Sequence, residues 1–270
     1  MDVNYWNEFA HEYDEQVIDA FTYGRSKTIE QQVKRFASLK KDAADFGCGP
    51  GKILPYLAEN FRAVYGYDFS DKLIEAARKR CADLKNIHIE QADLSQPVEH
   101  LPLMDVIVSL NAALMPDPNL RMSFLRGMAS RLKPGGHLIL NVPSVESLLF
   151  SYFRETEWYR REGSSPRAAE EQVDASYIIQ PSQTAQGIFI RGTEPTKHYL
   201  REELIVLARD EMRLETLDVL KMNYDWKTEM EDENVPDWMG EPYPWDWLLI
   251  AKKPRKRIAR RAQRSSSPGK

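Results

Sequence analysis

Between residues 42 and 143 the sequence alternates short apolar runs with segments of helical periodicity. The runs cover residues 43–46, 63–67, 87–89, 106–110 and 138–142, and the helical segments cover residues 52–60, 70–84 and 118–132. Apolar runs without polar alternation are typical of strands buried on both faces, and intervening helices place such strands in parallel. The first run is mostly Ala and Asp, so its assignment as a strand depends on its position. The pattern predicts an α/β fold built on a parallel sheet.

The chain before this core is predicted to be helical. Within residues 1–41, apolar side chains recur at three- and four-residue steps. The second helical stretch is amphipathic, with Ile29, Val33, Phe36 and Leu39 on one face.

After residue 143 the rhythm breaks. Residues 144–196 mix aromatic, charged and apolar stretches, which predicts an insertion that covers the ligand. A helix at 201–211 and strands at 214–221 and 245–252 then bring the sheet to seven strands, and the last strands are expected to form an antiparallel edge. Residues 1–252 are therefore predicted to form one domain.

The net charge of −4 hides a separation of charge along the chain. Residues 252–270 hold nine Lys or Arg and no acid, whereas residues 1–251 hold 28 basic and 41 acidic residues, a net charge of −13. Residues 253–270 are also Ser-rich and aperiodic, so a disordered basic tail is expected. The acidic body opposes binding of a polyphosphate. The tail leaves open a contact with nucleic acid or an anionic membrane surface, or a merely solubilising role.

Several whole classes of protein are disfavoured by the sequence. No apolar run approaches the roughly 18 residues that cross a bilayer, so no membrane span is expected. Met1 is followed by polar and acidic residues rather than by a secretory signal, and two cysteines cannot build a disulfide scaffold. These features predict a cytoplasmic protein. Neither Cys48 nor Cys81 has a partner at metal-ligand spacing, so no metal site is expected.

A glycine-rich loop, Asp45-Phe46-Gly47-Cys48-Gly49-Pro50-Gly51, lies between the first strand and the first helix of the core. Glycines let the backbone approach a ligand that a Cβ would repel, and the helix N-terminus adds free N–H groups. The loop predicts a nucleoside-type cofactor at the carboxyl edge of the sheet. A dinucleotide fingerprint would need a small residue where the chain has Lys52, and no Gly-Lys-Ser/Thr of a phosphate loop follows.

With four further segments in the same order, this loop resembles the class I S-adenosylmethionine (SAM) dependent methyltransferases of the small-molecule type. The resemblance covers roughly residues 5–253, and the other segments are Tyr5-Trp6 with Tyr13-Asp14, Tyr67-Asp68-Phe69-Ser70, Gln91-Ala92-Asp93-Leu94, and Leu132-Lys133-Pro134-Gly135-Gly136-His137-Leu138. It implies a Rossmann-like class I fold: a seven-stranded, mostly parallel sheet with an antiparallel edge strand, a helical N-terminal lid over residues 1–41, and the insertion after the fifth strand. The implied cofactor is SAM, with S-adenosylhomocysteine (SAH) as product.

The resemblance also assigns roles to individual residues. Asp68 would accept hydrogen bonds from the ribose hydroxyls, and Asp93 would lie near the adenine amino group, although both also suit simple strand-end or helix-cap acids. The expected cofactor contacts are Tyr5, Tyr13, Asp45, Gly47, Cys48, Gly49, Gly51, Asp68, Phe69, Asp93, Leu94 and Asn111. Acids suit the ammonium, diol and adenine N–H groups of SAM, whereas a pyrophosphate would repel Asp45.

Methyl transfer from a sulfonium is an in-line displacement, so positioning and exclusion of water supply most of the acceleration. A base is needed only where the nucleophile must lose a proton. Asn111, at the end of the fourth strand, is expected to position the acceptor, or it is an ordinary turn residue. His198 is the preferred base, with His11 as an alternative, although a surface role for His198 fits as well.

The acceptor is expected to be a small molecule. Asn111 is not followed by Pro-Pro and an aromatic residue, which argues against an enzyme that methylates a flipped nucleobase. Residues 225–246 hold eight acids and one Lys among several tryptophans, which predicts an amine or other cationic acceptor bound by cation–π contact. The alternative is an exposed acidic loop whose tryptophans pack on the sheet edge. Expected substrate contacts are Trp158, Tyr159, Tyr199 and Trp226.

These features together predict a SAM-dependent methyltransferase that acts on a small molecule. One alternative is an RNA or protein methyltransferase that uses residues 253–270 for docking. Another is a SAM-binding protein without catalytic activity. The acceptor atom and the oligomeric state are not predicted, because oxygen, nitrogen, sulfur and carbon acceptors share this fold.

Overall fold

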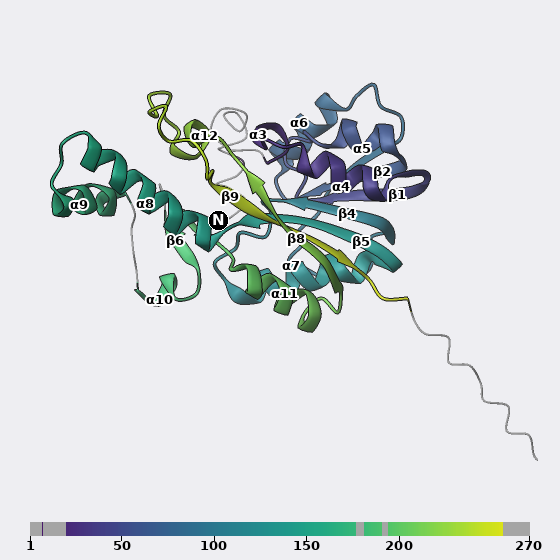
Figure 1. The fold of residues 1–270 in the computed structure, drawn as a ribbon. Helices are drawn as coiled ribbons and strands as arrows, with labels where there is room; N and C mark the ends of the chain where they lie inside the picture. Colours follow the sequence, from purple (N-terminus) through teal and green to yellow (C-terminus); the bar gives the residue numbers. More distant parts are fainter. Residues whose placement is uncertain (1–6, 8–19, 177–180, 191–193, 256–270) are drawn as a thin grey trace, which may run out of the picture.

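A seven-stranded sheet forms the centre of the computed structural model, which describes residues 7, 20–176, 181–190 and 194–255 (Figure 1). Its strands are β1 (Ser38–Phe46), β2 (Phe61–Asp68), β3 (Ile87–Gln91), β4 (Met104–Leu110), β5 (Leu132–Pro143), β8 (Glu215–Asn223) and β9 (Trp245–Lys252). The strand order is β3-β2-β1-β4-β5-β9-β8. Only β9 runs antiparallel to its neighbours β5 and β8, whereas the other pairs are parallel. The predicted seven-stranded, mostly parallel sheet with an antiparallel edge is confirmed.

Helices cover both faces of the sheet, as Figure 1 shows. On one face lie α4 (Thr28–Phe36), α5 (Leu54–Asn60) and α6 (Asp71–Arg80), and on the other lie α7 (Pro118–Arg131) and α11 (Arg201–Asp210). Each face has its own apolar core, because strand side chains alternate between the two sides. Leu57 and Val33 belong to the first core, and Phe124 and Leu204 to the second. Both faces of the sheet are thus covered by helices, as a parallel sheet requires.

Capping side chains fix where the helices of the core begin. Ser70 Oγ accepts the backbone N–H of Leu73 (3.2 Å) at the start of α6, as its position in the sequence predicts. Asp117 Oδ1 accepts the N–H groups of Asn119 and Leu120 at the start of α7. The helix predicted at 70–84 ends earlier, at Arg80, because the chain turns there to enter β3.

One residue of the second predicted N-terminal helix lies in a strand instead. Leu39 was expected on the apolar face with Phe36, but it lies in β1 and its exposed fraction is 70%. The helix ends at Phe36, and Ser38 already pairs with Phe61 of β2. The three-residue step from Phe36 to Leu39 continues the helical pattern by coincidence. Predictions for Tyr5, Tyr13 and His11, for residues 1–6 and 8–19 of the 1–41 lid, and for residues 256–270 lie outside the described residues.

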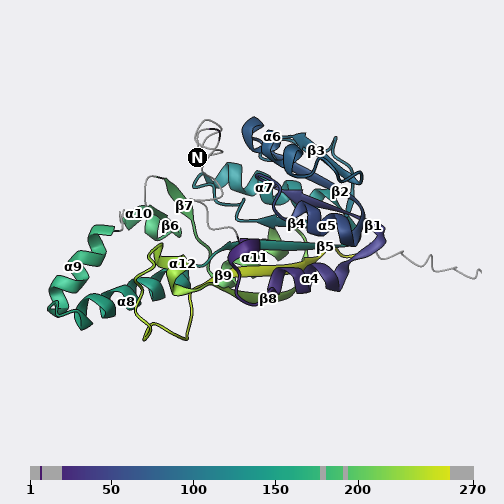
Figure 2. The same cartoon turned by 90° about the horizontal axis from the view of Figure 1, so that it is seen from above.

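The insertion forms a separate small layer at the carboxyl end of the sheet. It contains α8 (Val145–Arg161), α9 (Pro166–Ser176), α10 (Pro181–Thr184) and the two-stranded hairpin of β6 (Ile188–Ile190) and β7 (Pro195–Lys197). Figure 2 shows α8 and α9 extending away from the sheet, with the short helix α12 (Trp226–Met230) beside α8. Leu148, Val173 and Phe189 form its apolar core. In the described ranges, no helix is long and apolar enough to cross a bilayer.

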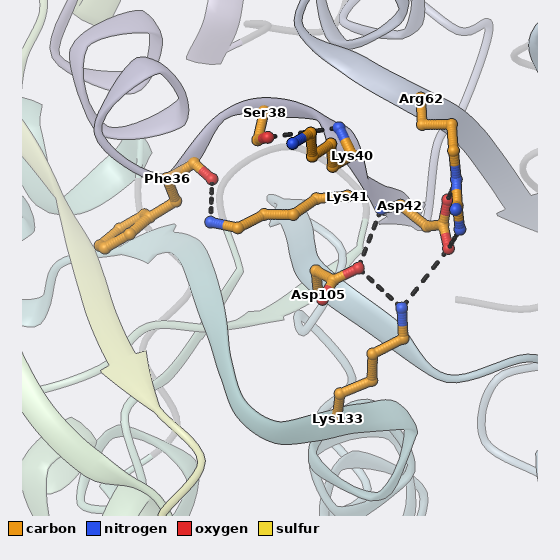
Figure 3. Close-up of polar contacts among 8 residues, drawn as sticks. All are labelled: Phe36, Ser38, Lys40, Lys41, Asp42, Arg62, Asp105 and Lys133. Atoms are coloured by element: carbon orange, nitrogen blue, oxygen red, sulfur yellow. Dashed lines mark hydrogen bonds and ion pairs between the residues drawn. The ribbon is translucent and has the colours of Figure 1, made fainter.

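At the opposite, amino end of the strands, an ion-pair network joins four of them (Figure 3). Arg62 on β2 donates two hydrogen bonds to the carboxylate of Asp42 on β1, at 2.8 and 2.6 Å. Lys133 on β5 donates to Asp105 on β4 at 2.7 Å and reaches Asp42 at 3.4 Å. The hydrogen bond from Arg62 lowers the pKa of Asp42. This network fixes the register of the strands on the side away from the glycine loop.

Replacing Asp42 with Asn removes the charge on which Arg62 and Lys133 converge. We expect Asp42→Asn to lower the free energy of unfolding at pH 7 by about 1–2 kcal/mol, measured by urea denaturation. Because the pKa of Asp42 is lower in the folded chain than its ordinary 3.8, its contribution is present above that pH and is lost as the pH falls below it. The difference between wild type and variant should therefore shrink at pH 3.

A matched control is Asp218→Asn. The carboxylate of Asp218 pairs with Arg35 at 2.8 Å, but both side chains are about half exposed. Its loss should cost less than about 0.5 kcal/mol. Equal destabilisation by the two variants, or an Asp42→Asn effect that does not change with pH, would contradict the role assigned to the network.

Candidate active site

The glycine loop after β1 passes so close to the rest of the fold that side chains at Gly47 and Gly51 would meet their neighbours. Gly47 has φ +83°, and a Cβ there would lie 2.3 Å from the Cβ of Ala112. The N–H groups of Gly47 and Cys48 both donate to the carbonyl of Tyr67, at 2.8 and 2.9 Å. Gly51, at φ +78°, packs against Ala77 of α6. The loop is therefore held by β2, by the segment after β4 and by α6.

Asp68, the last residue of β2, holds the loop with its carboxylate. Its Oδ2 accepts the N–H of Gly49 at 2.9 Å, and its Oδ1 accepts the N–H of Ser70 at 3.0 Å. The side chain is buried, and burial raises its pKa although the backbone hydrogen bonds from Ser70, Gly49 and Phe69 oppose the shift. The carboxylate keeps acceptor capacity beyond these bonds for a ligand. The first nineteen residues contribute one described contact here, from Ser70 Oγ to Asn7 Oδ1 at 2.6 Å.

A cavity of about 420 Å³ opens beside the loop. Seven of the predicted cofactor contacts line it, namely Gly47, Gly49, Asp68, Phe69, Asp93, Leu94 and Asn111. Asp93 is exposed, and its Oδ1 accepts from the backbone N–H and the hydroxyl of Ser95. The cavity thus has a polar side at the ends of β2 and β3. The structure brings together residues that are up to 64 positions apart in the chain, and their roles in binding stay predictions.

The apolar side of this cavity was missed by the sequence interpretation. It consists of Leu73, Ala92, Leu110, Ala112, Leu114, Met115, Leu120 and Phe124. Six of these eight residues come from the stretch 110–124, which runs from the end of β4 into α7. The signal was present in the apolar stretch at 112–115, which follows β4 directly. An apolar wall facing a polar one suits a flat aromatic ring with polar edges.

A smaller hollow of about 30 Å³ lies on the other side of the loop. It is lined by Asp45, Cys48 and Lys52 among others, so an acidic and a basic side chain border the same space. Burial raises the pKa of the Cys48 thiol, which is therefore not a thiolate near neutral pH. From the sequence, Lys52 only excludes a dinucleotide fingerprint, and its place beside Asp45 is not predicted.

A second cavity, of about 170 Å³, adjoins the first at Asn111. Asn111 lines both and has φ +50°, a region that Asn tolerates better than most residues. The other lining residues are Pro143, Ser144, Ser147, Leu148, His198, Tyr224, Glu229, Trp245 and Asp246. They come from β5, α8, α12, β9 and the connections beside them, so the insertion and the acidic segment both contribute.

Asp246 is the centre of a buried polar cluster at this second cavity. Its Oδ2 accepts hydrogen bonds from Tyr224 Oη (2.6 Å), Asn141 Nδ2 (2.8 Å) and Asn111 Nδ2 (3.3 Å). Burial raises the pKa of Asp246 even though these hydrogen bonds oppose the shift. Burial and the neighbouring carboxylate also raise the pKa of Tyr224. Neither residue was predicted as part of a site.

The predicted base His198 also lines the second cavity. Its ring meets Phe189 edge-on at 5.4 Å between centroids, and Nδ1 lies 3.2 Å from the carbonyl of Thr196. His88 and His137 are packing residues instead, because they stack on Tyr65 and Phe36 respectively. Among the described residues, no group of three or more His, Cys, Asp and Glu side chains is placed to hold a metal ion.

The aromatic residues predicted to contact the substrate do not line either cavity. Tyr199 is fully buried and donates its hydroxyl to the carbonyl of Ala113 at 2.6 Å. Trp226 is buried and donates Nε1 to the carbonyl of Gly240 at 3.0 Å. Trp158 packs with it in the cluster between α8 and α12, and Tyr159 packs with Leu148 and Val173. In this structure these four side chains support the walls of the site rather than facing it.

Comparison with known proteins shows which proteins the chain is similar to. Residues 43–136 match the family model described as a methyltransferase domain. Ubiquinone biosynthesis O-methyltransferase of Coxiella burnetii is 32% identical over 120 residues, which is 43% of this chain and 48% of that protein. Trans-aconitate 2-methyltransferase of Streptomyces coelicolor is 32% identical over 127 residues, 44% of this chain and 41% of that protein. The chain thus spans about half or less of the length of these curated relatives.

Solved structures extend the likeness to most of the chain. A SAM-dependent methyltransferase from Methanosarcina mazei has a TM-score of 0.60 at 19% identity and covers 83% of this chain and 98% of its own. The N-methyltransferase NodS from Bradyrhizobium japonicum, in complex with SAH, has a TM-score of 0.57 at 14% identity and covers 93% and 100%. Residues 43–136 therefore match a methyltransferase domain, and the chain as a whole has the fold of the solved SAM-dependent methyltransferases.

The close approach at Gly47 gives a direct test of the loop. Gly47→Ala should strain the backbone at φ +83° and also force Ala112 away, so SAM binding should weaken by at least tenfold in calorimetry. Gly163→Ala is the matched control, because Gly163 also has a positive φ (+106°) but a Cβ added there would meet nothing within 4 Å. Gly163→Ala should cost stability of about 1–3 kcal/mol and leave SAM affinity unchanged. Equal SAM affinities for the two variants would contradict the assignment.

Proposed function

We propose that the protein transfers a methyl group from SAM to a small-molecule acceptor. The observation that carries the proposal is the meeting of two cavities at Asn111, one beside the glycine loop and one beneath the insertion. In a displacement reaction the two reactants must face each other along a line, and adjoining cavities of unequal size provide that arrangement. The methyltransferase domain and fold support the same chemistry.

The residues around the larger cavity fit SAM by their chemistry. Asp68 keeps lone pairs for the ribose hydroxyls, and Asp93 suits the adenine amino group. The apolar wall that includes Leu120 and Phe124 suits the adenine ring. Asp45 and Lys52 face one hollow with opposite charges, which matches the ammonium and carboxylate of an amino acid end. Gly47 provides a surface that a Cβ would fill.

When bound, SAM supplies an electrophilic methyl group on a sulfonium. The residues of the chain then have three tasks: they orient the reactants, exclude water and receive a proton if the acceptor must lose one. Asn111 lies where the two cavities meet and is held by hydrogen bonds to Asn141 and Asp246. Its amide is therefore fixed for positioning the acceptor. The insertion, whose α8 lines the second cavity through Ser147 and Leu148, covers the site.

The acceptor is proposed to be small because the second cavity measures about 170 Å³, less than half of the first. The names of the relatives support either of two acceptor atoms. The Coxiella burnetii protein is an O-methyltransferase of ubiquinone biosynthesis, and NodS is an N-methyltransferase.

The cofactor assignment is tested by calorimetry with SAM and SAH. Wild-type protein should bind both, and Asp68→Asn should weaken binding by at least tenfold, because the neutral amide accepts fewer hydrogen bonds from a diol and loses the charge. Asp71→Asn is the matched control, since Asp71 is an exposed acid at the start of α6 just three positions away. A wild-type protein that does not bind SAM, or an Asp68→Asn variant that binds it normally, would refute the proposal.

The alternative polymer acceptor is tested by removing residues 256–270. This deletion keeps Lys253, whose Nζ donates to carbonyls at the end of α7, but it removes six Lys or Arg. Small-molecule methylation should persist at the wild-type rate. If RNA or a protein were the acceptor, its binding should weaken strongly and depend steeply on salt. SAM binding without methylation of any acceptor would favour the non-catalytic alternative.

A further inference from the structure

Asp246 is a buried acid for which no cation in the described part of the chain provides a counter-charge. Its exposed fraction is 9%, and the donors to its carboxylate are a phenol and two amides, all neutral. No Lys or Arg in the described ranges forms an ion pair with it. Acids are almost never buried in proteins without a paired charge, because desolvation costs more than neutral hydrogen bonds return. A missing counter-charge at a cavity wall points to a cationic ligand.

The other residues that line the second cavity add negative charge rather than a cation. Glu229 on α12 faces the same space, and its Oε1 accepts from the Ser151 hydroxyl at 3.0 Å. His198 is the only lining side chain in the described residues that can carry a positive charge. Trp245 also lines the cavity, and its buried Nε1 has no hydrogen-bond acceptor among the described residues. An unused donor beside two carboxylates suits a ligand that carries both a cation and a polar acceptor atom.

We propose that the acceptor is a small amine whose ammonium group pairs with Asp246 and gives its proton to that carboxylate. The proposal rests on the proposed methyl transfer and names the acceptor class and the proton acceptor at the same site. A phenolate would be repelled by Asp246 and Glu229, whereas an ammonium replaces the counter-charge that the fold lacks. Because Asp246 touches Asn111, the amine nitrogen would lie at the junction of the two cavities.

The proton transfer is required by the chemistry of the acceptor. An ammonium has no lone pair, so one N–H proton must move to Asp246 before the nitrogen can attack. The nitrogen lone pair then forms the bond to the methyl carbon while the carbon–sulfur bond breaks and its electron pair goes to sulfur. The products are a methylated ammonium, neutral SAH and a protonated Asp246, which releases its proton to solvent. Burial raises the pKa of Asp246 and so makes it a better base than an exposed acid.

The test compares Asp246→Asn with wild type, using labelled SAM and separate panels of small primary and secondary amines and of phenols. Wild type should methylate amines, and Asp246→Asn should lower kcat/KM for them by about 100-fold or more, with KM for the amine raised and SAM affinity within twofold. Asn keeps the shape and the hydrogen-bond acceptor for Tyr224. Asp237→Asn is the matched control: it removes an acid of the same segment that lines neither cavity, and kcat/KM should stay within twofold.

Tyr224→Phe tests whether Tyr224 positions Asp246 for catalysis. The measured quantity is the pH profile of kcat/KM, which would not shift if Tyr224 only stabilised the fold. Losing the hydroxyl removes a hydrogen bond to the ionised carboxylate, so the acidic limb of the kcat/KM profile should move to higher pH. The other titratable groups facing Asp246 are Glu229 and His198 across the cavity, and Asn111 and Asn141 are neutral. A limb that disappears in His198→Gln but not in Asp246→Asn would overturn the proposal.

Failure of this proposal is distinguishable from failure of the methyl-transfer proposal. SAM binding together with methylation confined to phenols, or with no methylated acceptor in either panel, overturns the amine assignment and leaves the cofactor assignment standing. Asp246→Asn with amine kcat/KM within threefold of wild type also overturns it. Absence of SAM binding by the wild type refutes the proposed function itself.

Discussion

The carboxylate of Asp68 is the contact on which the geometry of the site depends. It divides its two oxygens between the N–H groups of Gly49 and Ser70, so it joins the loop after β1 to the start of α6. The loop in turn is pressed on Ala112 through Gly47, which connects it to the segment after β4. Three strand ends that are distant in sequence are thereby held at one edge, and both walls of the larger cavity follow from that. Ionic contacts at the other end of the strands only fix their register.

Local motifs made the cofactor side of the site predictable. A glycine loop between strand and helix, and an acid at the end of the next strand, owe their position to contacts within about 20 residues of each other. The order of strands and helices could be predicted from apolar periodicity. The end of the helix at Phe36 could not, because Leu39 continues the helical spacing although it lies in β1. Whether Asp93 and Asn111 bind SAM remains a prediction that their place at the cavity makes chemically reasonable.

The acceptor side could not be derived in the same way. Composition marked residues 225–246 as acidic and aromatic, but it did not say which side chains face inward. Trp226 packs against α8, whereas Asp246 meets partners that are 22, 105 and 135 positions away in the chain. Such a cluster forms only when β4, β5 and β9 come together in the sheet. Asp68 and Asp246 are both buried acids, but backbone N–H groups hold the first, whereas neutral side chains hold the second.

The reversed direction of β9 has a consequence for the two ends of that strand. Because β9 runs against β5, its first residues lie at the carboxyl edge, where Asp246 meets Asn111 and Asn141, and its last residue lies at the amino edge. There Lys253 exchanges backbone hydrogen bonds with Gly135 and Gly136. Eight residues of extended chain span about 25 Å. The chain therefore leaves the sheet about one strand length from the carboxyl edge. A large molecule held by residues 256–270 would have to reach around the domain to approach the two cavities.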